Sequence, residues 1–125
     1  MLATGVHHLS FTVANLERAQ KFYEGILGLE TIPRPDFGVA GIWYGAGNAE
    51  IHLIELPEGA TGTGTPAEKL TPLANHNAFA IDDYAETLTF LQSQGVEIVE
   101  TSAARGQMWI RDPDGNIFEL IAPPA

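Results

Sequence analysis

The chain has 125 residues, 45% of them hydrophobic, and a formal net charge of −10 at pH 7. This length fits one compact domain, and the negative charge argues against a nucleic acid or an anionic membrane surface as partner. The absence of cysteine excludes a disulfide framework and a thiolate nucleophile. No apolar run approaches the ~20 residues needed to span a bilayer, so we expect a soluble, cytoplasmic protein that does not bind a membrane.

The first half of the chain predicts a strand, a helix and three further strands. The predicted strands span residues 8–13, 29–33, 39–44 and 49–56. Asn15 is a candidate N-cap for a helix over 16–27, and Gly28 is expected to end that helix. Prolines and glycines between 33 and 38, and a turn at 45–48, separate the later strands.

Residues 57–73 are rich in Gly, Thr and Pro and lack periodicity, which predicts a connector that serves either as a plain linker or as a mobile lid. After it the order of elements repeats, with Asp82 and Asp83 capping a helix over 84–94. The predicted strands of the second half span 75–81, 96–100, 106–111 and 116–121. We therefore predict an α+β fold in which two βαβββ modules, about 1–56 and 74–125, form a single domain over 1–125.

The two halves also match residue by residue. At a shift of 68 residues the matched positions include His8 with His76, Phe11 with Phe79 and Phe22 with Phe90. At a shift of 67, after one residue is dropped from the second half, Ile51–Ile54 aligns with Phe118–Ile121 and His52 aligns with Glu119. A repeat that preserved only the fold would match its apolar positions, so ionisable residues at all four places indicate a shared function.

Hairpin pairing predicts which face of each sheet carries these residues. If Asp112–Gly115 form the last turn, Met108 lies opposite Glu119. The equivalent first hairpin sets Trp43 opposite Glu50 and Gly41 opposite His52. The apolar neighbours of His52 and Glu119 then point beneath the helices, and the ionisable residues face the hollow of each curved, mixed sheet, with the helices outside.

Each module thus supplies one histidine from its first strand and one further ligand from its last strand. Two modules side by side can bring four ligands to one point: His8, His52, His76 and Glu119. Three imidazoles and a carboxylate suit Zn²⁺, Fe²⁺, Ni²⁺, Co²⁺ or Mn²⁺ and leave coordination positions open for substrate. A single strand histidine is more often structural, but the symmetry of the set favours ligands. His7 is interpreted as structural because we expect it on the opposite face of the strand from His8.

Other residues of the predicted hollow face are candidates to line a substrate pocket, although packing between sheets would explain them equally well. These residues are Ser10, Thr12, Trp43 and Met108. Three arginines can each hold an anionic group: Arg34, Arg105 and Arg111. Surface ion pairing is the simpler explanation for all three in so acidic a chain.

These residues resemble the vicinal oxygen chelate superfamily, which contains glyoxalase I, extradiol dioxygenases and metal-free bleomycin-binding proteins. The resemblance extends over almost the whole chain, in the stretches His8–Val13, Leu16–Tyr23, Leu27–Leu29, His76–Asp83 and Asp112–Leu120. By position it implies that His8, His52, His76 and Glu119 hold a divalent metal. It also exposes two departures from glyoxalase I, which typically has glutamate where His52 stands and a glutathione-binding arginine where Thr12 stands.

The resemblance implies a metal-dependent lyase or isomerase of the glyoxalase I-like kind. Such an enzyme chelates a small substrate through two oxygens and stabilises the resulting enolate, with Glu119 as the carboxylate that moves a proton. The alternatives are an extradiol-type dioxygenase and a non-catalytic protein that binds an antibiotic. Similar short chains usually form homodimers with the metal at the interface, so we expect a homodimer, with a site closed within one chain as the alternative.

Overall fold

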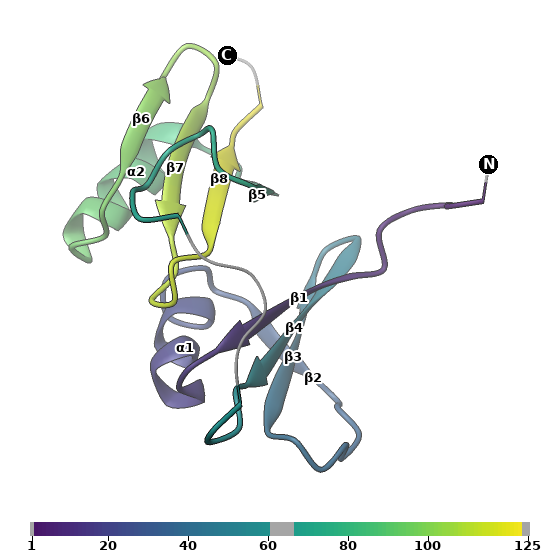
Figure 1. The fold of residues 1–125 in the computed structure, drawn as a ribbon. Helices are drawn as coiled ribbons and strands as arrows, with labels where there is room; N and C mark the ends of the chain where they lie inside the picture. Colours follow the sequence, from purple (N-terminus) through teal and green to yellow (C-terminus); the bar gives the residue numbers. More distant parts are fainter. Residues whose placement is uncertain (1, 61–66, 124–125) are drawn as a thin grey trace. The chain divides into compact units, whose positions relative to one another are not determined.

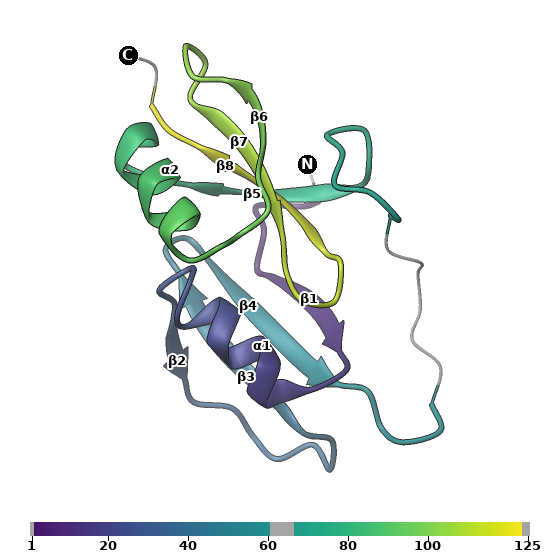
Figure 2. The same ribbon diagram turned by 90° about the vertical axis from the view of Figure 1, so that its left-hand side faces the viewer.

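The computed structural model describes residues 2–60 and 67–123, and the chain divides into two compact units, Met1–Gly64 and Thr65–Ala125 (Figures 1 and 2). The first unit contains β1 (His8–Val13), α1 (Leu16–Tyr23), β2 (Glu30–Ile32), β3 (Gly41–Ala46) and β4 (Ala49–Glu55). The second unit contains β5 (His76–Ala80), α2 (Tyr84–Ser93), β6 (Val99–Ser102), β7 (Gln107–Arg111) and β8 (Ile117–Ile121). The predicted α+β fold with two βαβββ modules is confirmed.

Each unit has one mixed four-stranded sheet. The strand orders are β1-β4-β3-β2 and β5-β8-β7-β6. In both sheets the first strand pairs in parallel with the last strand of its unit, and the remaining pairs are antiparallel. The first and last strands of a unit are therefore neighbours, which brings the two predicted ligands of each unit onto adjacent strands.

Both helices begin at the predicted caps. The Asn15 side chain accepts a hydrogen bond from the Arg18 amide (2.8 Å), and Asp83 accepts one from the Glu86 amide (2.8 Å). The first helix ends at Tyr23, four residues before the predicted end at 27. Gly25 follows closely, and glycine is a poor helix former, so the apolar stripe that continues through 26 and 27 does not extend the helix. Among the described residues no helix is long and apolar enough to cross a bilayer.

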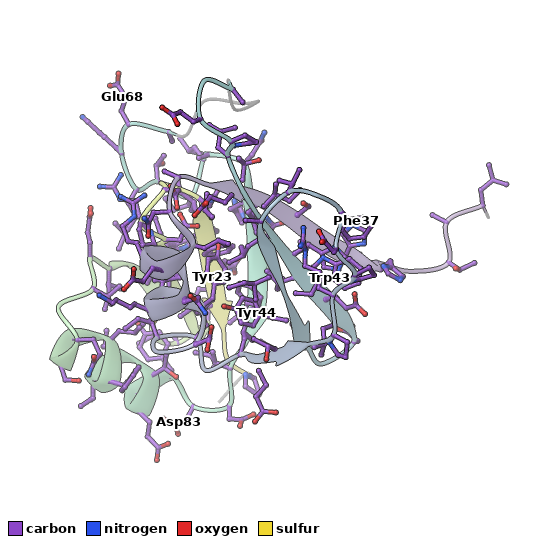
Figure 3. All side chains as sticks on the ribbon, turned by 90° about the horizontal axis from the view of Figure 1, so that it is seen from below. Tyr23, Phe37, Trp43, Tyr44, Glu68 and Asp83 are labelled. Carbon is purple, nitrogen blue, oxygen red and sulfur yellow. The ribbon has the colours of Figure 1, made fainter. Side chains whose placement is uncertain are left out.

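One face of each sheet packs against its own helix. In the first unit Tyr44, Ile51 and Leu53 are fully buried, and the Tyr44 ring stacks on Tyr23 of α1 with centroids 6.1 Å apart (Figure 3). Burial and the hydrogen bond that its hydroxyl donates to Glu24 (2.7 Å) raise the pKa of Tyr44. Tyr44 therefore stays protonated at neutral pH and belongs to the core of the unit.

The first hairpin is tighter than predicted. Ala46 pairs with Ala49, so Gly47 and Asn48 make a two-residue turn, and Gly47 supplies the positive φ of 62° that such a turn needs. As a result Trp43 pairs with His52 and Gly41 with Ile54, which corrects the predicted pairing by two residues. A shift of two leaves every side chain on its predicted face.

The last hairpin has a longer connection than predicted. Trp109 pairs with Glu119 and Met108 with Leu120, one residue away from the prediction. A shift of one transfers a side chain to the other face of the sheet. Met108 is fully buried beside Leu120, so its assignment to the same face as Glu119 is wrong, and Trp109 lies there instead.

A buried carboxylate sets this register. Asp112 is 4% exposed, and the Asp112 amide donates to the Asn116 carbonyl (2.9 Å), which closes a connection one residue longer than predicted. The Asp112 carboxylate accepts bonds from the amides of Asp114 (2.9 Å) and Asn116 (2.8 Å) and from Asn116 Nδ2 (2.8 Å). The proline and glycine of the turn were recognised from sequence, but the side chain that lengthens it was not.

We expect Asp112→Ala to lower the free energy of unfolding by about 2–4 kcal/mol, because charge-assisted hydrogen bonds to a buried group are lost. Urea denaturation followed by circular dichroism measures the change. Asp82→Ala is the matched control, since Asp82 is exposed, and it should shift stability by less than about 0.5 kcal/mol. Equal losses in the two variants would show that the Asp112 carboxylate does not hold the turn.

Candidate metal and substrate site

The predicted ligands lie on the sheet face opposite the helix in each unit, which we call the ligand face. In the first unit Ser10, His52 and Trp43 are neighbours across β1, β4 and β3. Two residues earlier on β1 and β4, His8 pairs with Glu50. Tyr44 and Ile51, which alternate with Trp43 and His52, point to the helix side. The predicted face is therefore correct for this unit.

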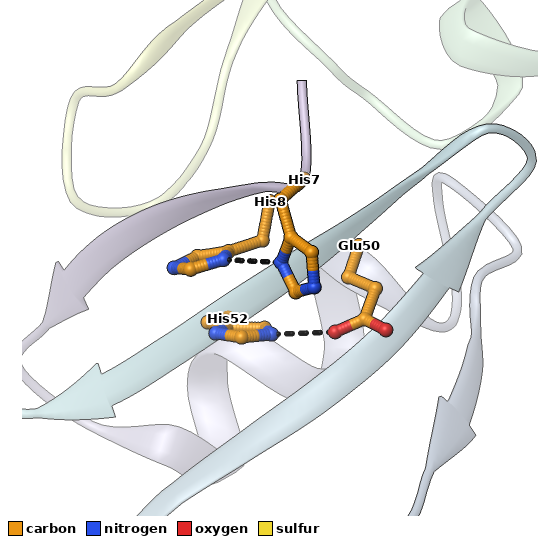
Figure 4. Close-up of polar contacts among 4 residues, drawn as sticks. All are labelled: His7, His8, Glu50 and His52. Atoms are coloured by element: carbon orange, nitrogen blue, oxygen red, sulfur yellow. Dashed lines mark hydrogen bonds and ion pairs between the residues drawn. The ribbon is translucent and has the colours of Figure 1, made fainter. Parts of the chain in front are cut away.

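The His52 ring is held between two other rings. Its centroid lies 4.1 Å from that of Trp43 and 4.0 Å from that of His8, and the interplanar angles are 6° and 15°. His52 Nε2 lies 2.9 Å from Glu50 Oε1 (Figure 4). Because an ionised carboxylate only accepts hydrogen bonds, Nε2 carries a proton, and in the neutral form of the ring the lone pair is on Nδ1. His52, which is 7% exposed, is thus fixed in position and in tautomer.

His8 is exposed, and its Nδ1 lies 2.8 Å from His7 Nδ1 (Figure 4). The expectation that His7 points away from His8 is wrong, because β1 begins at His8 and strand alternation does not extend to residue 7. The stacked rings of His8 and His52 hold their lone pairs in nearly parallel planes. His8 must turn about its side-chain bonds before both histidines can bind one ion, and its exposure leaves it free to turn.

In the second unit, hydrogen bonds orient both residues of the predicted ligand pair, His76 and Glu119. His76 Nδ1 lies 2.8 Å from the Ala74 carbonyl, which only accepts hydrogen bonds, so Nδ1 carries a proton, and in the neutral form of the ring Nε2 holds the lone pair. That nitrogen lies 3.6 Å from Glu119 Oε1. The other carboxylate oxygen, Oε2, accepts a bond from Gln107 Nε2 (2.9 Å). Trp109 contacts His76 edge to face, with centroids 4.4 Å apart.

The spacing of this pair suits a metal. At 3.6 Å, His76 Nε2 and Glu119 Oε1 are too far apart for a good hydrogen bond; they form an ion pair when His76 is protonated and present two lone pairs when it is neutral. Two atoms that each lie ~2.1 Å from one divalent ion are separated by about 3.0–3.5 Å. The outer partners, Ala74 and Gln107, fix the orientation of both ligands, as partners of metal ligands commonly do.

The predicted ligands occur as two pairs, His8 with His52 in the first unit and His76 with Glu119 in the second. Within residues 2–60 and 67–123 no cluster of three or more histidine, aspartate or glutamate side chains is arranged to hold a metal. The meeting of all four residues at one ion stays a prediction. Ser10 and Thr12 are exposed beside His8 and remain candidates to contact a substrate.

Part of the predicted connector covers the ligand face of the second sheet. Leu70 is buried against Trp109 and Ile117, with Ala67 and Ala74 packed around them. Residues 61–66 of the same predicted connector lie outside the described residues. The segment over 67–74 therefore contributes to the core of the second unit and leads directly into β5, which carries His76.

Three residues of the site were missed in the sequence: Glu50, Gln107 and Trp109. The two tryptophans of the chain stand opposite the second ligand of each unit, Trp43 opposite His52 and Trp109 opposite Glu119. These tryptophans align at a shift of 66 residues, whereas His52 and Glu119 align at 67, so the repeat alone does not fix the register. Glu50 lies two residues before His52, and strand alternation alone places both on one face.

Comparison with known proteins settles the family. Residues 5–120 match the model of the Glyoxalase/Bleomycin resistance protein/Dioxygenase superfamily. The chain belongs to this superfamily. It is 26% identical to Glyoxylase I 4 of Arabidopsis thaliana over 123 residues, covering 94% of this chain and 70% of that protein. It is 27% identical over 124 residues to a lactoylglutathione lyase of Neisseria meningitidis, covering 91% of this chain and 87% of the relative.

A solved structure of a glyoxalase/dioxygenase from Nostoc punctiforme has the same fold, with a TM-score of 0.77 and 24% identity. The match covers 97% of this chain and 92% of that one. This superfamily includes lyases, dioxygenases and resistance proteins, so membership supports an enzyme without choosing its reaction.

Proposed function

We propose that this superfamily member is a metal-dependent lyase or isomerase of the glyoxalase I-like kind, acting on a small substrate chelated through two adjacent oxygens. The ligands would be His8, His52, His76 and Glu119, and the ion Zn²⁺, Ni²⁺, Fe²⁺, Mn²⁺ or Co²⁺. The pair formed by His76 and Glu119 carries this proposal, because both side chains are oriented by outer partners and a neutral His76 would present the Nε2 lone pair to Glu119 Oε1 at 3.6 Å. When bound, the metal would act as a Lewis acid on a substrate carbonyl.

Glu119 is the residue that would move the proton. Its Oε2 is held by Gln107, whereas its Oε1 faces His76. A carboxylate in this state can take a proton from the carbon beside the carbonyl and return it to the neighbouring carbon. Trp43 and His52 would form a flat wall under the substrate, and the hydroxyls of Ser10 and Thr12 offer hydrogen bonds from the same face.

The rigidity of His52 favours this reaction over that of an extradiol-type dioxygenase. The dioxygenase reaction needs two histidines and one carboxylate, with the remaining face of the iron free for substrate and oxygen. His52 is clamped by Trp43 and Glu50 and cannot readily swing out of the site. A fourth ligand at this position would obstruct the face that the dioxygenase needs.

A non-catalytic protein that sequesters an antibiotic is the alternative from another functional class. The aromatic surface of Phe37 and Trp43, whose ring centroids are 5.9 Å apart, favours it, since flat drug molecules stack on such surfaces. The donor set favours the enzyme, because a binder that performs no chemistry has no need of three imidazoles and a carboxylate.

We further propose that the two units form a single domain and that two chains form a homodimer. The first unit of one subunit would face the second unit of the other and complete the ligand set. Each unit supplies one pair of ligands, which is the requirement for such an exchange.

Metal binding is the decisive test. We expect elemental analysis to find about one first-row transition ion per subunit, and a saturating ion to raise the melting temperature of metal-free protein, since a ligand at 100 times its Kd stabilises by about 2.7 kcal/mol. His76→Ala should lower metal affinity at least about 100-fold, whereas Gln92→Ala, at an exposed position of α2, retains all four ligands and should bind normally. No stoichiometric metal and no gain in melting temperature would overturn the proposal and favour the sequestering protein.

A further inference from the structure

Arg34 lies on the ligand face of the first sheet, beside Trp43. A Cβ added to Gly41 would collide with the Leu53 carbonyl oxygen and would also lie 2.8 Å from Arg34 Nη2 and 2.9 Å from Arg34 Cζ, so the Gly41 backbone lies against both the neighbouring strand and the guanidinium. Gly41 stands two residues before Trp43 on β3, and residues two apart on a strand share a face. The guanidinium therefore lies against the backbone of Gly41, two residues from Trp43 on the strand that pairs with His52.

The loop between β2 and β3 holds this guanidinium in place. Arg34 Nη2 donates a hydrogen bond to the Val39 carbonyl (2.9 Å), and Arg34 Cζ lies 5.2 Å from the centroid of the Phe37 ring. Phe37 in turn contacts Trp43 (Figure 3). Gly38, with φ of 77°, makes the turn, and its amide donates to the Asp36 side chain (2.8 Å). The Arg34 guanidinium thus contacts Phe37, which contacts Trp43, and Trp43 stacks on His52.

Most of the hydrogen-bonding capacity of Arg34 is unused. Its Nε is buried and has no hydrogen-bond partner, and within residues 2–60 and 67–123 no carboxylate forms an ion pair with it. Arg111 differs, because its Nη2 pairs with Glu97 (2.9 Å) and its Nη1 donates to the Glu68 carbonyl (3.4 Å). Surface ion pairing therefore explains Arg111 and fails for Arg34. A buried N–H without a partner is costly, and the charge of Arg34 is not balanced by an ion pair within the described residues.

We propose that Arg34 binds an anionic oxygen group of the substrate, a carboxylate or a phosphate-like group, beyond the two oxygens that the metal chelates. The planar guanidinium presents paired donors that match such groups. In a chain with a net charge of −10, an anionic substrate needs a dedicated cation on the site surface. This inference rests on the proposed function, and it adds a substrate class: small vicinal-oxygen compounds with an anionic tail.

A matched pair of probes tests it. Metal-loaded protein is titrated calorimetrically with 3-(3,4-dihydroxyphenyl)propanoate and with the methyl ester of the same compound, which keeps the chelating oxygens and loses the charge. We expect the wild-type protein to prefer the carboxylate at least about tenfold, Arg34→Gln to lose that preference while binding the ester normally, and Arg34→Lys to retain part of it. Lys21→Gln, on the exposed side of α1, removes the same charge and should change neither affinity.

Equal binding of the two probes by wild-type protein, or an equal loss for both in Arg34→Gln, would overturn the role of Arg34. Failure of both probes to bind would count against the proposed function instead. The anion site is then judged on metal-free protein titrated with inorganic phosphate. A shift of the Arg34 Nε–H resonance that follows saturation supports the site, and an unmoved resonance overturns it.

Discussion

Glu119→Gln is expected to lower kcat at least about 100-fold, because general-base catalysis by a positioned side chain contributes factors of that order and an amide cannot accept the substrate proton. The fold should be unaffected, since Gln107 can still donate to the amide oxygen that replaces Glu119 Oε2. The measurement is incorporation of solvent deuterium at the carbon beside the carbonyl, across a panel of small α-hydroxy ketones and hemithioacetals.

The control for this experiment is Glu86→Gln, which removes the same charge from an exposed position in the first turn of α2. Its turnover should match wild type. Unchanged metal content together with unchanged turnover in Glu119→Gln would remove Glu119 from the mechanism. Unchanged turnover with lowered metal content would instead leave Glu119 as a ligand only, and the proton would have to be moved by another group.

The repeat in the sequence predicted the fold because the two halves conserve what a βαβββ module needs. An alternating strand and an Asn or Asp cap are local signals, and both were found at the predicted place in each unit, although the first helix ends before its apolar stripe does. The parallel pairing of first and last strands then places His8 near His52 and His76 near Glu119. Local patterns therefore predicted the ligand pairs of the candidate site.

Register was harder to predict because it depends on turns, where one residue decides the outcome. Gly47 allowed a two-residue turn in the first hairpin, and buried Asp112 lengthened the last one. The first error left each side chain on its predicted face of the sheet. The second placed Met108 on the ligand face, where the structure has Trp109. Each tryptophan pairs with the second ligand of its unit, but the offsets differ, since Trp43 stands nine residues before His52 and Trp109 ten before Glu119.

Arg34 shows the other limit of sequence reasoning. It lies in a loop without periodicity, and its acidic surroundings made surface ion pairing the simpler explanation. Only the backbone of Gly41 and the rings of Phe37 and Trp43 place the guanidinium on the ligand face. Such placements depend on contacts between segments that no strand or helix pattern relates.

A heterodimer of His8→Ala and Glu119→Ala subunits is expected to bind about half the metal of wild type, whereas neither homodimer binds it stoichiometrically. If each site takes the first unit of one chain and the second unit of the other, one site of the heterodimer receives both substitutions. The other site receives none. Co-expression with two different affinity tags isolates the mixed dimer, and elemental analysis with a melting curve measures its metal.

The decisive control pairs His8→Ala with His52→Ala. Both residues belong to the first unit, so every site in that heterodimer carries one substitution and no recovery is expected. Recovery confined to the first combination requires that ligands from different units, on different chains, meet at one ion. No recovery in either combination would count against the exchanged arrangement and favour a site closed within a single chain. Recovery in both would contradict the assignment of His8 and His52 to the same site.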